Sequence, residues 1–378
     1  MAGIIKGSFV GALSTVCILA GTVALESATP ASGSPAIAST SAVATPANRR
    51  AGISDPKAWS NRRLAAQVVL AGVDMSNLAK AKKWTTAGVG GLVLFGSPTR
   101  STQRNLKRLR NSNRSIAPFV SSDEDGGRVQ RLARALGRLP SAASMGSSMT
   151  PSRVKRLAAR YGNKMRRLGV NMDLAPVADL KVRGKFIARD GRAFASHPRK
   201  VGRYVKAWDA GMRSARVATA VKHWPGHGSS ADTHVGSGRT PRWSVVQRRD
   251  LVPFLAAFRA GARSVMVGHL TVPGLTERGS PASMSPRALR TLRFETGPST
   301  VIMTDSLSMS AVTSALHQSV SAASIRSLRA GSDIAMVNVG NPMVIVRSIS
   351  KAIKSGKLSR SRMVASVRRI LALKAQLG

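Results

Sequence analysis

Short apolar runs rich in β-branched residues recur along the chain and alternate with longer amphipathic segments. Eight such runs lie at residues 68–72, 89–95, 117–121, 170–176, 217–221, 264–267, 300–303 and 333–339. Segments with a helical spacing of apolar residues separate most of them, for example residues 152–168, 198–213, 245–260 and 319–330. Short β-branched runs predict buried strands, whereas a 3.6-residue period predicts helices that pack on one face.

This alternation predicts an α/β protein. Eight strands separated by helices is the number found in a (β/α)8 barrel of the TIM type. A doubly wound open sheet is the alternative, but no glycine-rich dinucleotide turn follows the first strand. The segment 359–377 predicts a closing amphipathic helix whose apolar side comprises Met363, Val364, Val367, Ile370, Leu371 and Leu373. We therefore expect a single barrel over residues 55–378.

The N-terminal residues differ in composition from the rest of the chain. Residues 7–25 are mostly apolar and follow Lys6, and a Ser/Ala/Thr/Pro-rich stretch comes next. This pattern predicts a secretory signal over residues 1–28 and a flexible linker over residues 29–54. An uncleaved membrane anchor is the alternative. Cys17, the only cysteine, lies inside the apolar run, so the pattern disfavours a lipoprotein and the exported part can form no disulfide.

The formal net charge is +43. A field of this sign favours anionic partners, so we expect an electrostatic association with cell-wall polymers outside the cell. Lysine and arginine are spread along the chain, and aromatic residues make up only 4% of it. Bases would find few stacking partners, so specific nucleic-acid binding is not expected. We expect a monomer without an obligate protein partner.

The densest group of acid–base side chains lies in the sequence K-H-W-P-G-H-G at residues 222–228 and D-T-H at residues 232–234. Pro225 and Gly226 disfavour a regular helix, so these groups are expected on a loop that follows the fifth predicted strand. The same helix-breaking pair argues against a zinc motif formed by His223 and His227. No G-x-S-x-G elbow of a serine hydrolase occurs, and we expect neither a metal nor another cofactor.

Acidic residues follow several of the other predicted strands, although the chain has only 16 of them. Strand carboxyl ends open on one face of a parallel barrel, so these residues should meet there. The residues expected to converge are Asp123, Asp179, Lys222, His223, Asp232, His234, His269 and Asp305. Carboxylates, imidazoles and cations together suit a polyhydroxylated ligand and the cleavage of an acetal. Gly126-Gly127, after the third strand, is weak evidence for phosphate binding.

Five motifs in order resemble glycoside hydrolase family 3, in its β-N-acetylglucosaminidase branch. The loop of residues 222–234 resembles K-H-F-P-G-H-G followed by D-S-H, and residues 123–131 resemble D-Q-E-G-G-R-V-Q-R. Residues 173–179, 191–194 and 304–309 are similar to the family's [ND]-x-A-P-V-x-D, R-x-F and T-D-x-L-x-M motifs.

The resemblance implies a barrel enzyme that acts on β-linked N-acetylglucosaminides, including peptidoglycan and chitin fragments. Asp305 would be the nucleophile that forms a covalent glycosyl-enzyme, and His234, paired with Asp232, the acid/base. The residues that would hold the terminal sugar are Asp123, Arg131, Arg192, Lys222 and His223.

The departures from the family motifs include Glu124 and Asp125, which replace Gln and Glu, and Trp224, which replaces Phe. These departures bear on fine specificity. Adjacent carboxylates at 123 and 124 also leave open a substrate-assisted mechanism, with the acetamido group as nucleophile. Two further alternatives are a family member that cleaves another β-glycoside, such as a glucoside, and a wall-binding protein without activity.

Overall fold

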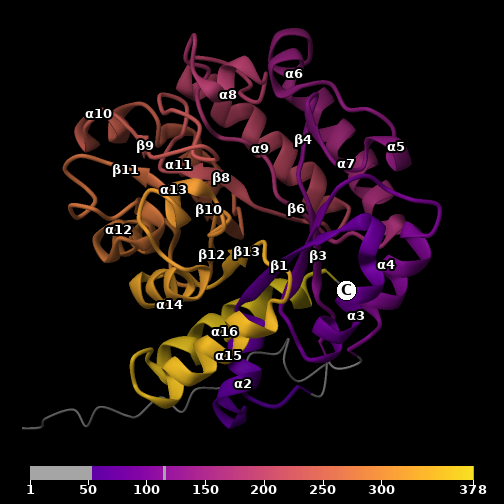
Figure 1. Cartoon of the computed structure of the whole chain (residues 1–378). Helices are drawn as coiled ribbons and strands as arrows, with labels where there is room; N and C mark the ends of the chain where they lie inside the picture. Colours follow the sequence, from indigo (N-terminus) through magenta and orange to yellow (C-terminus); the bar gives the residue numbers. More distant parts are fainter. Residues whose placement is uncertain (1–52, 114–115, 378) are drawn as a thin grey trace, which may run out of the picture. The chain divides into compact units, whose positions relative to one another are not determined.

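Parallel strands surrounded by helices form the centre of the fold (Figure 1). The computed structural model describes residues 53–113 and 116–377, so the predicted signal and nearly all of the predicted linker lie outside the described residues. Six strands form one parallel sheet in the order β13-β1-β2-β3-β6-β7, and three form another in the order β12-β10-β8. The predicted α/β class with a parallel sheet is confirmed.

The strands coincide with the eight predicted runs. Their bounds are β1 (Val69–Asp74), β2 (Gly91–Phe95), β3 (Phe119–Ser122), β6 (Met172–Asp173), β7 (Ala218–Thr219), β8 (Val221–Trp224), β10 (Ser264–Val267), β12 (Val301–Thr304) and β13 (Ala335–Val337). The fifth predicted run is divided at Ala220 into β7 and β8, and β8 continues to Trp224. The prediction of a loop was wrong for Lys222 and His223, because β8 pairs with β10 as far as Trp224 and the loop begins only at Pro225. Short hairpins and pairs are formed by β4 (Glu124–Gly126), β5 (Val129–Gln130), β9 (Gly238–Arg239) and β11 (Leu270–Thr271).

The two sheets are linked by single bridges. Met303 at the end of β12 pairs with Ile334 before β13, and Val177 pairs with Lys222 of β8. Within the larger sheet, the first strand lies between the last and the second, with Val69 opposite Ala335. The sequence predicted a (β/α)8 barrel, in which the strands form one closed sheet. The hydrogen-bonded strands of the structure do not form such a continuous closed sheet.

Helices follow most of the strands. Their bounds are α2 (Asn61–Gln67), α3 (Leu78–Thr86), α4 (Thr102–Arg110), α5 (Ala133–Leu136), α6 (Ala142–Ser148), α7 (Pro151–Leu168), α8 (Phe186–Arg189), α9 (Pro198–Ser214), α10 (Trp243–Arg248), α11 (Val252–Arg259), α12 (Pro286–Thr296), α13 (Ser310–Thr313), α14 (Val320–Ala330), α15 (Met343–Lys354) and α16 (Arg360–Ala375). Three 3-10 turns lie at Pro56–Ala58, Met75–Asn77 and Ala282–Met284. None of the helices in the described part of the chain is long and apolar enough to cross a membrane.

Local sequence explains where these helices begin and end. In α7, Thr150 accepts a hydrogen bond from the Arg153 N–H, Pro151 occupies the first turn, and Gly169 ends the helix at a φ of 105°. The predicted helix at 245–260 is instead two helices, α10 and α11. The break spans residues 249–251, and Pro253, which has no N–H to donate, lies in the first turn of α11.

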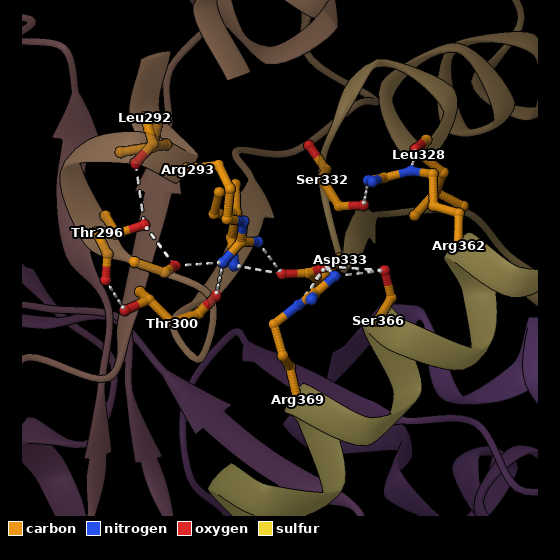
Figure 2. A network of polar contacts seen from close by, with 12 residues as sticks. Leu292, Arg293, Thr296, Thr300, Leu328, Ser332, Asp333, Arg362, Ser366 and Arg369 are labelled. Atoms are coloured by element: carbon orange, nitrogen blue, oxygen red, sulfur yellow. Dashed lines mark hydrogen bonds and ion pairs between the residues drawn. The ribbon is translucent and has the colours of Figure 1, made fainter. Parts of the chain in front are cut away.

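The last helix is fixed to the end of the strands opposite the site by a buried polar network (Figure 2). Asp333, which precedes β13, accepts hydrogen bonds from Arg293 of α12 at 2.7 Å and from Arg369 of α16 at 2.8 and 3.0 Å. The Ser366 hydroxyl and the Ile302 N–H complete its partners, at 2.7 and 3.0 Å. The predicted apolar side of α16 is buried, as expected. One carboxylate thus joins α12, α16 and β12.

Candidate active site

Two carboxylates after β3 share a buried pair of cations. Nζ of Lys222 lies 2.6 Å from Oδ1 of Asp123 and 2.9 Å from Oδ1 of Asp125. The Nε–H of Arg192 donates to Oδ2 of Asp125 at 2.8 Å. Only Asp123 is open to solvent, with 20% of its side chain exposed, because Asp125 and Lys222 are buried. Asp123 is therefore the carboxylate of this cluster that a ligand can reach.

The charges in this cluster stabilise one another. Burial alone would raise the pKa of Asp125, but Lys222 and then Arg192 offset that effect and lower it. Burial would lower the pKa of Lys222, and the two carboxylates raise it instead. Asp125 and Lys222 are thus kept in their charged forms as a buried ion pair, with 2.9 Å between Nζ and Oδ1.

His223 is oriented by a carboxylate from the neighbouring strand end. Oδ2 of Asp179 lies 2.7 Å from its Nδ1, and a guanidinium nitrogen of Arg192 lies 3.4 Å from its Nε2. Arginine can only donate, so Nε2 accepts and Nδ1 carries the proton toward Asp179. The other oxygen of Asp179 accepts the N–H of His227 at 2.6 Å. Asp179 therefore fixes both histidines of the K-H-W-P-G-H-G loop.

Asp305 directly follows β12, where it faces several imidazoles. Its N–H donates to the Val267 carbonyl at 2.9 Å, and its Oδ1 accepts the Ser306 N–H at 2.7 Å. Burial would raise the pKa of Asp305, but the imidazoles of His223 and His269 and the Ser306 N–H lower it to about 2. Asp305 is therefore a carboxylate at any physiological pH.

His269 supports the segment that carries Asp305. Its Nε2 lies 2.9 Å from the Ser306 carbonyl, and its Nδ1 lies 2.7 Å from the Ser283 hydroxyl. A carbonyl only accepts, so Nε2 holds a proton, while the Ser283 hydroxyl can pair with Nδ1 in either direction. Burial lowers the pKa of His269, and the Asp305 carboxylate and the hydrogen bond to Ser306 work in the opposite direction.

Asp232 and His234 form a pair on the loop after β8. Oδ1 of Asp232 accepts the His234 N–H at 2.9 Å and lies 2.7 Å from Nδ1 of the same residue. The His234 side chain is 59% exposed, whereas the sugar-holding candidates Lys222 and His223 are buried. Burial works against ionisation of Asp232, but its hydrogen bonds to the His234 N–H and imidazole lower its pKa. Asp232 thus holds Nδ1 of His234, which leaves Nε2 as the ring nitrogen outside the pair.

Arg131, the remaining candidate that follows β3, has different surroundings. Arg131 donates its N–H to the Asp123 carbonyl at 3.3 Å, and its guanidinium lies 5.6 Å from the centre of the Phe95 ring. Its Nε is buried without a hydrogen-bond partner among the described residues. A ligand oxygen could therefore accept a hydrogen bond from this Nε–H.

The carboxyl oxygens of Glu124 already accept hydrogen bonds from other residues of the protein. It accepts hydrogen bonds from Ser122 and Tyr161 at 2.6 Å and from the Leu132 N–H at 3.1 Å, and burial raises its pKa to about 7. It is fully buried, so it does not share the exposed position of Asp123. This geometry counts against the adjacent-carboxylate mechanism.

Two other kinds of site considered from the sequence, a metal site and a phosphate site at Gly126-Gly127, gain no support. Within residues 53–113 and 116–377, no group of three or more His, Cys, Asp and Glu side chains is placed to hold a metal ion. Gly126 and Gly127 form the turn of the β4–β5 hairpin at φ values of 85° and 61°. A side chain on Gly126 would collide with the Pro140 carbonyl, so close packing accounts for this pair of glycines without a phosphate.

Asp123, Lys222, His223, Asp305 and the 232/234 pair are predicted to lie on one face. In the structure Lys222 pairs with Asp123, and His223 and His234 act electrostatically on Asp305, while the roles of these residues stay predictions. The partnership of Asp125 with Arg192, 67 residues apart, was not predicted. Nor was a role for His227 and Phe186, whose rings lie 6.0 Å apart beside the loop. The sequence carried no signal for the Arg192–Asp125 ion pair, because the burial of Arg192 becomes visible only in the structure.

Residues 63–373 match the model of the glycosyl hydrolase family 3 N-terminal domain. The chain belongs to glycoside hydrolase family 3. The resemblance of the five motifs and the prediction of a glycoside hydrolase are thereby confirmed. The family match covers the strands, the acid–base loop and Asp305 alike.

Similar family 3 proteins include several named β-hexosaminidases. The chain is 35% identical to β-hexosaminidase LpqI of Mycobacterium tuberculosis over 95% of this chain and 97% of that protein. It is 34% identical to a β-hexosaminidase of Stenotrophomonas maltophilia over 71% and 81% of the two chains. Among solved structures, a family 3 glycosyl hydrolase of Mycobacterium smegmatis has a TM-score of 0.78 at 34% identity and covers 85% of this chain and 98% of that one.

A β-N-acetylglucosaminidase of Paenibacillus sp. also has a TM-score of 0.78. It is 27% identical and matches over 85% of this chain, but over only 63% of its own longer chain. The relatives that match along nearly their whole length are therefore close to this chain in length.

Proposed function

We propose that this protein is a retaining exo-β-N-acetylglucosaminidase that removes terminal β-linked N-acetylglucosamine from peptidoglycan or chitin fragments. The observation that carries the proposal is the combination of an ionised Asp305 at a strand end with an exposed Asp232–His234 pair on the adjacent loop. The names of the similar proteins, which are β-hexosaminidases and a β-N-acetylglucosaminidase, support the sugar specificity.

In the proposed reaction, an oxygen of Asp305 attacks the anomeric carbon and the bond to the leaving oxygen breaks. Nε2 of His234 gives its proton to that oxygen, while Asp232 stabilises the imidazolium beforehand and holds its Nδ1. The neutral imidazole then takes a proton from water. That water attacks the anomeric carbon and releases Asp305, so the configuration is retained.

The remaining polar groups would hold the terminal sugar. Asp123 can accept from a pair of hydroxyls, and the cations of Lys222 and Arg192 can donate to sugar oxygens. His223 offers Nε2 as an acceptor, and Arg131 offers its unpaired Nε–H. In this proposal the strands form a single (β/α)8 barrel over residues 55–378, and the bridges from Met303 to Ile334 and from Val177 to Lys222 support that arrangement.

The proposal is tested by comparing aryl N-acetylglucosaminide with aryl glucoside, each with water and with added phosphate as acceptor. Turnover of the first substrate at a kcat/KM at least about tenfold higher is expected. A preference for the glucoside would favour the alternative of another β-glycosidase. Binding without turnover of either substrate would favour a non-catalytic wall-binding protein.

We further propose that the protein is exported through the signal at residues 1–28 and is retained at the cell wall by its charge of +43. Attraction between exposed charges is screened within about 8–10 Å at physiological ionic strength, so salt should release the protein. The experiment measures retention on anionic wall polymer between 0.05 and about 0.5 M salt. Retention that does not change with salt would contradict an electrostatic attachment.

A further inference from the structure

Within the segment 231–237, which carries the acid–base pair, one residue is buried, and it lies between the two members of the pair. Thr233 is 1% exposed. The flanking residues of the segment 231–237 are intermediate or exposed, and Val235 is 80% exposed. A buried side chain in an otherwise exposed segment limits where its neighbours can lie, so Thr233 is placed to control the position of His234.

Three parts of Thr233 contact three different segments. Its hydroxyl lies 3.1 Å from Nε2 of His227, and its carbonyl accepts the N–H of Ala311 at 3.3 Å. Its methyl lies so close to Gly238 that a Cβ on that glycine would come within 2.7 Å of it. Ala311 belongs to α13, which follows Asp305, so Thr233 also ties the loop to the segment that carries the proposed nucleophile.

His227, whose Nε2 pairs with the Thr233 hydroxyl, is itself held in place by other contacts. Its N–H donates to Asp179 at 2.6 Å, and its ring lies edge-on to that of His223 with 5.5 Å between the centroids. The imidazole is buried, and desolvation lowers its pKa to about 4. A neutral imidazole offers one donor and one acceptor nitrogen, and a hydroxyl can pair with either of them.

Phe186 of α8 restrains the same arrangement from the other side. Its ring meets that of His234 at 5.9 Å in an edge contact and that of His227 at 6.0 Å. The imidazole of His234 is therefore bounded by Asp232 at Nδ1 and by an aromatic ring beside it. These contacts fix the orientation of the ring, and the contacts of Thr233 fix the backbone that carries it.

We propose that Thr233 is a positioning residue: the hydrogen bond between its hydroxyl and His227 sets where the loop places the imidazole of His234. This inference rests on the proposed acid/base role of His234. Proton transfer depends steeply on geometry, and a misplacement of about 1 Å costs on the order of 100-fold in rate. Loss of the hydroxyl should therefore weaken protonation of the leaving oxygen more than it weakens sugar binding.

The test compares two matched variants. Thr233→Val keeps the shape and loses the hydroxyl, whereas Thr233→Ser keeps the hydroxyl and loses the methyl. We expect Thr233→Val to lower kcat/KM about 10- to 100-fold for an N-acetylglucosaminide with a poor leaving group, and less than about threefold for an activated aryl one. Thr233→Ser should stay close to wild type with both substrates.

A uniform loss with both substrates would mean a merely structural role and would overturn the inference, as would a wild-type profile for Thr233→Val. His227 provides a second route if Thr233→Val folds poorly. His227→Gln keeps an amide nitrogen near the place of Nε2, whereas His227→Asn is too short. Only His227→Asn should show the leaving-group-dependent loss, and equal behaviour of the two would also overturn the inference.

Failure of this inference and failure of the proposed function give different results. If His234→Ala itself shows no dependence on the leaving group, the acid role fails. If His234→Ala shows that dependence while Thr233→Val and His227→Asn behave as wild type, only the positioning role fails.

Discussion

Asp179 and His223 form a buried pair in which Oδ2 of the carboxylate lies 2.7 Å from Nδ1 of the imidazole. Burial works against ionisation of Asp179, but His223 and the His227 N–H offset it and lower its pKa. An ionised Asp179 holds the proton on Nδ1, and Nε2 is then an acceptor for Arg192 or a sugar hydroxyl. This relationship sets the chemistry that His223 can offer to a ligand.

We predict that Asp179→Asn lowers kcat/KM by about 10- to 100-fold, because a hydrogen bond to a charged group is worth about 1.5–3 kcal/mol. Steady-state kinetics on an aryl N-acetylglucosaminide measures the loss. Asp209→Asn is the matched control, since Asp209 is also buried but binds Thr219 and Arg213 instead. Equal kinetic losses in both variants would indicate general damage to the fold and contradict the role of Asp179.

The acid role of His234 predicts a dependence on the leaving group. His234→Ala should reduce kcat/KM by about 100-fold or more for a poor leaving group, in the range that general acid catalysis contributes. An activated aryl leaving group departs without a proton, so its kcat/KM should fall much less. Equal losses across a series of aryl substrates, arranged by the pKa of the phenol, would contradict the assignment.

We predict that the free energy of unfolding depends on pH because of Glu124. Its pKa is raised to about 7 in the folded state from 4.5, so the folded protein keeps a proton that the unfolded chain loses. The free energy of unfolding should therefore fall by up to about 3 kcal/mol as pH rises from 4.5 to 7, and level off above that.

Glu124→Gln, which restores the residue usual in the family motif, removes this titration. Urea unfolding of both proteins at several pH values between 5 and 8 measures the difference. Parallel stability profiles for wild type and Glu124→Gln would show that Glu124 does not titrate in this range.

Two adjacent arginines of α16 should differ in their contribution to stability. Arg369 bonds the fully buried Asp333 (Figure 2), whereas Arg368 pairs with the exposed Asp55 at 2.7 Å. Arg369→Ala should lower the free energy of unfolding by about 2–4 kcal/mol, because it leaves a buried carboxylate short of a partner. Arg368→Ala should cost less than about 1 kcal/mol.

Denaturant unfolding of the two variants provides the comparison. Neither variant should change KM, since Asp333 precedes β13 at the opposite end of the strands from Asp305. Similar losses of stability in both would contradict the account of the network.

The strands and the residues at their ends could be predicted because hydrophobic periodicity is local. Asp305 and Asp123 each follow a short apolar run, and the parallel arrangement places them together. The division of the strands into two sheets could not be predicted at this level, since the pairing of strands far apart in the chain depends on long-range geometry.

Ion pairs and hydrogen bonds between residues far apart in the sequence could not be predicted either. The bond of Arg192 to Asp125 joins positions far apart in the chain, and the network around Asp333 collects arginines from two helices. Sequence spacing carries no information on which of many basic residues reaches a given carboxylate. The abundance of arginine in this chain makes that choice harder.

The central claim is that Asp305 forms a covalent bond to the sugar. A fluorinated N-acetylglucosaminyl donor with an activated leaving group slows hydrolysis of such an intermediate and allows it to be trapped. Mass spectrometry of the intact protein and of its peptides should then show one added sugar on the peptide that contains Asp305. The adduct should be absent from Asp305→Asn. Turnover of the donor without any adduct, or an adduct on another residue, would contradict the account.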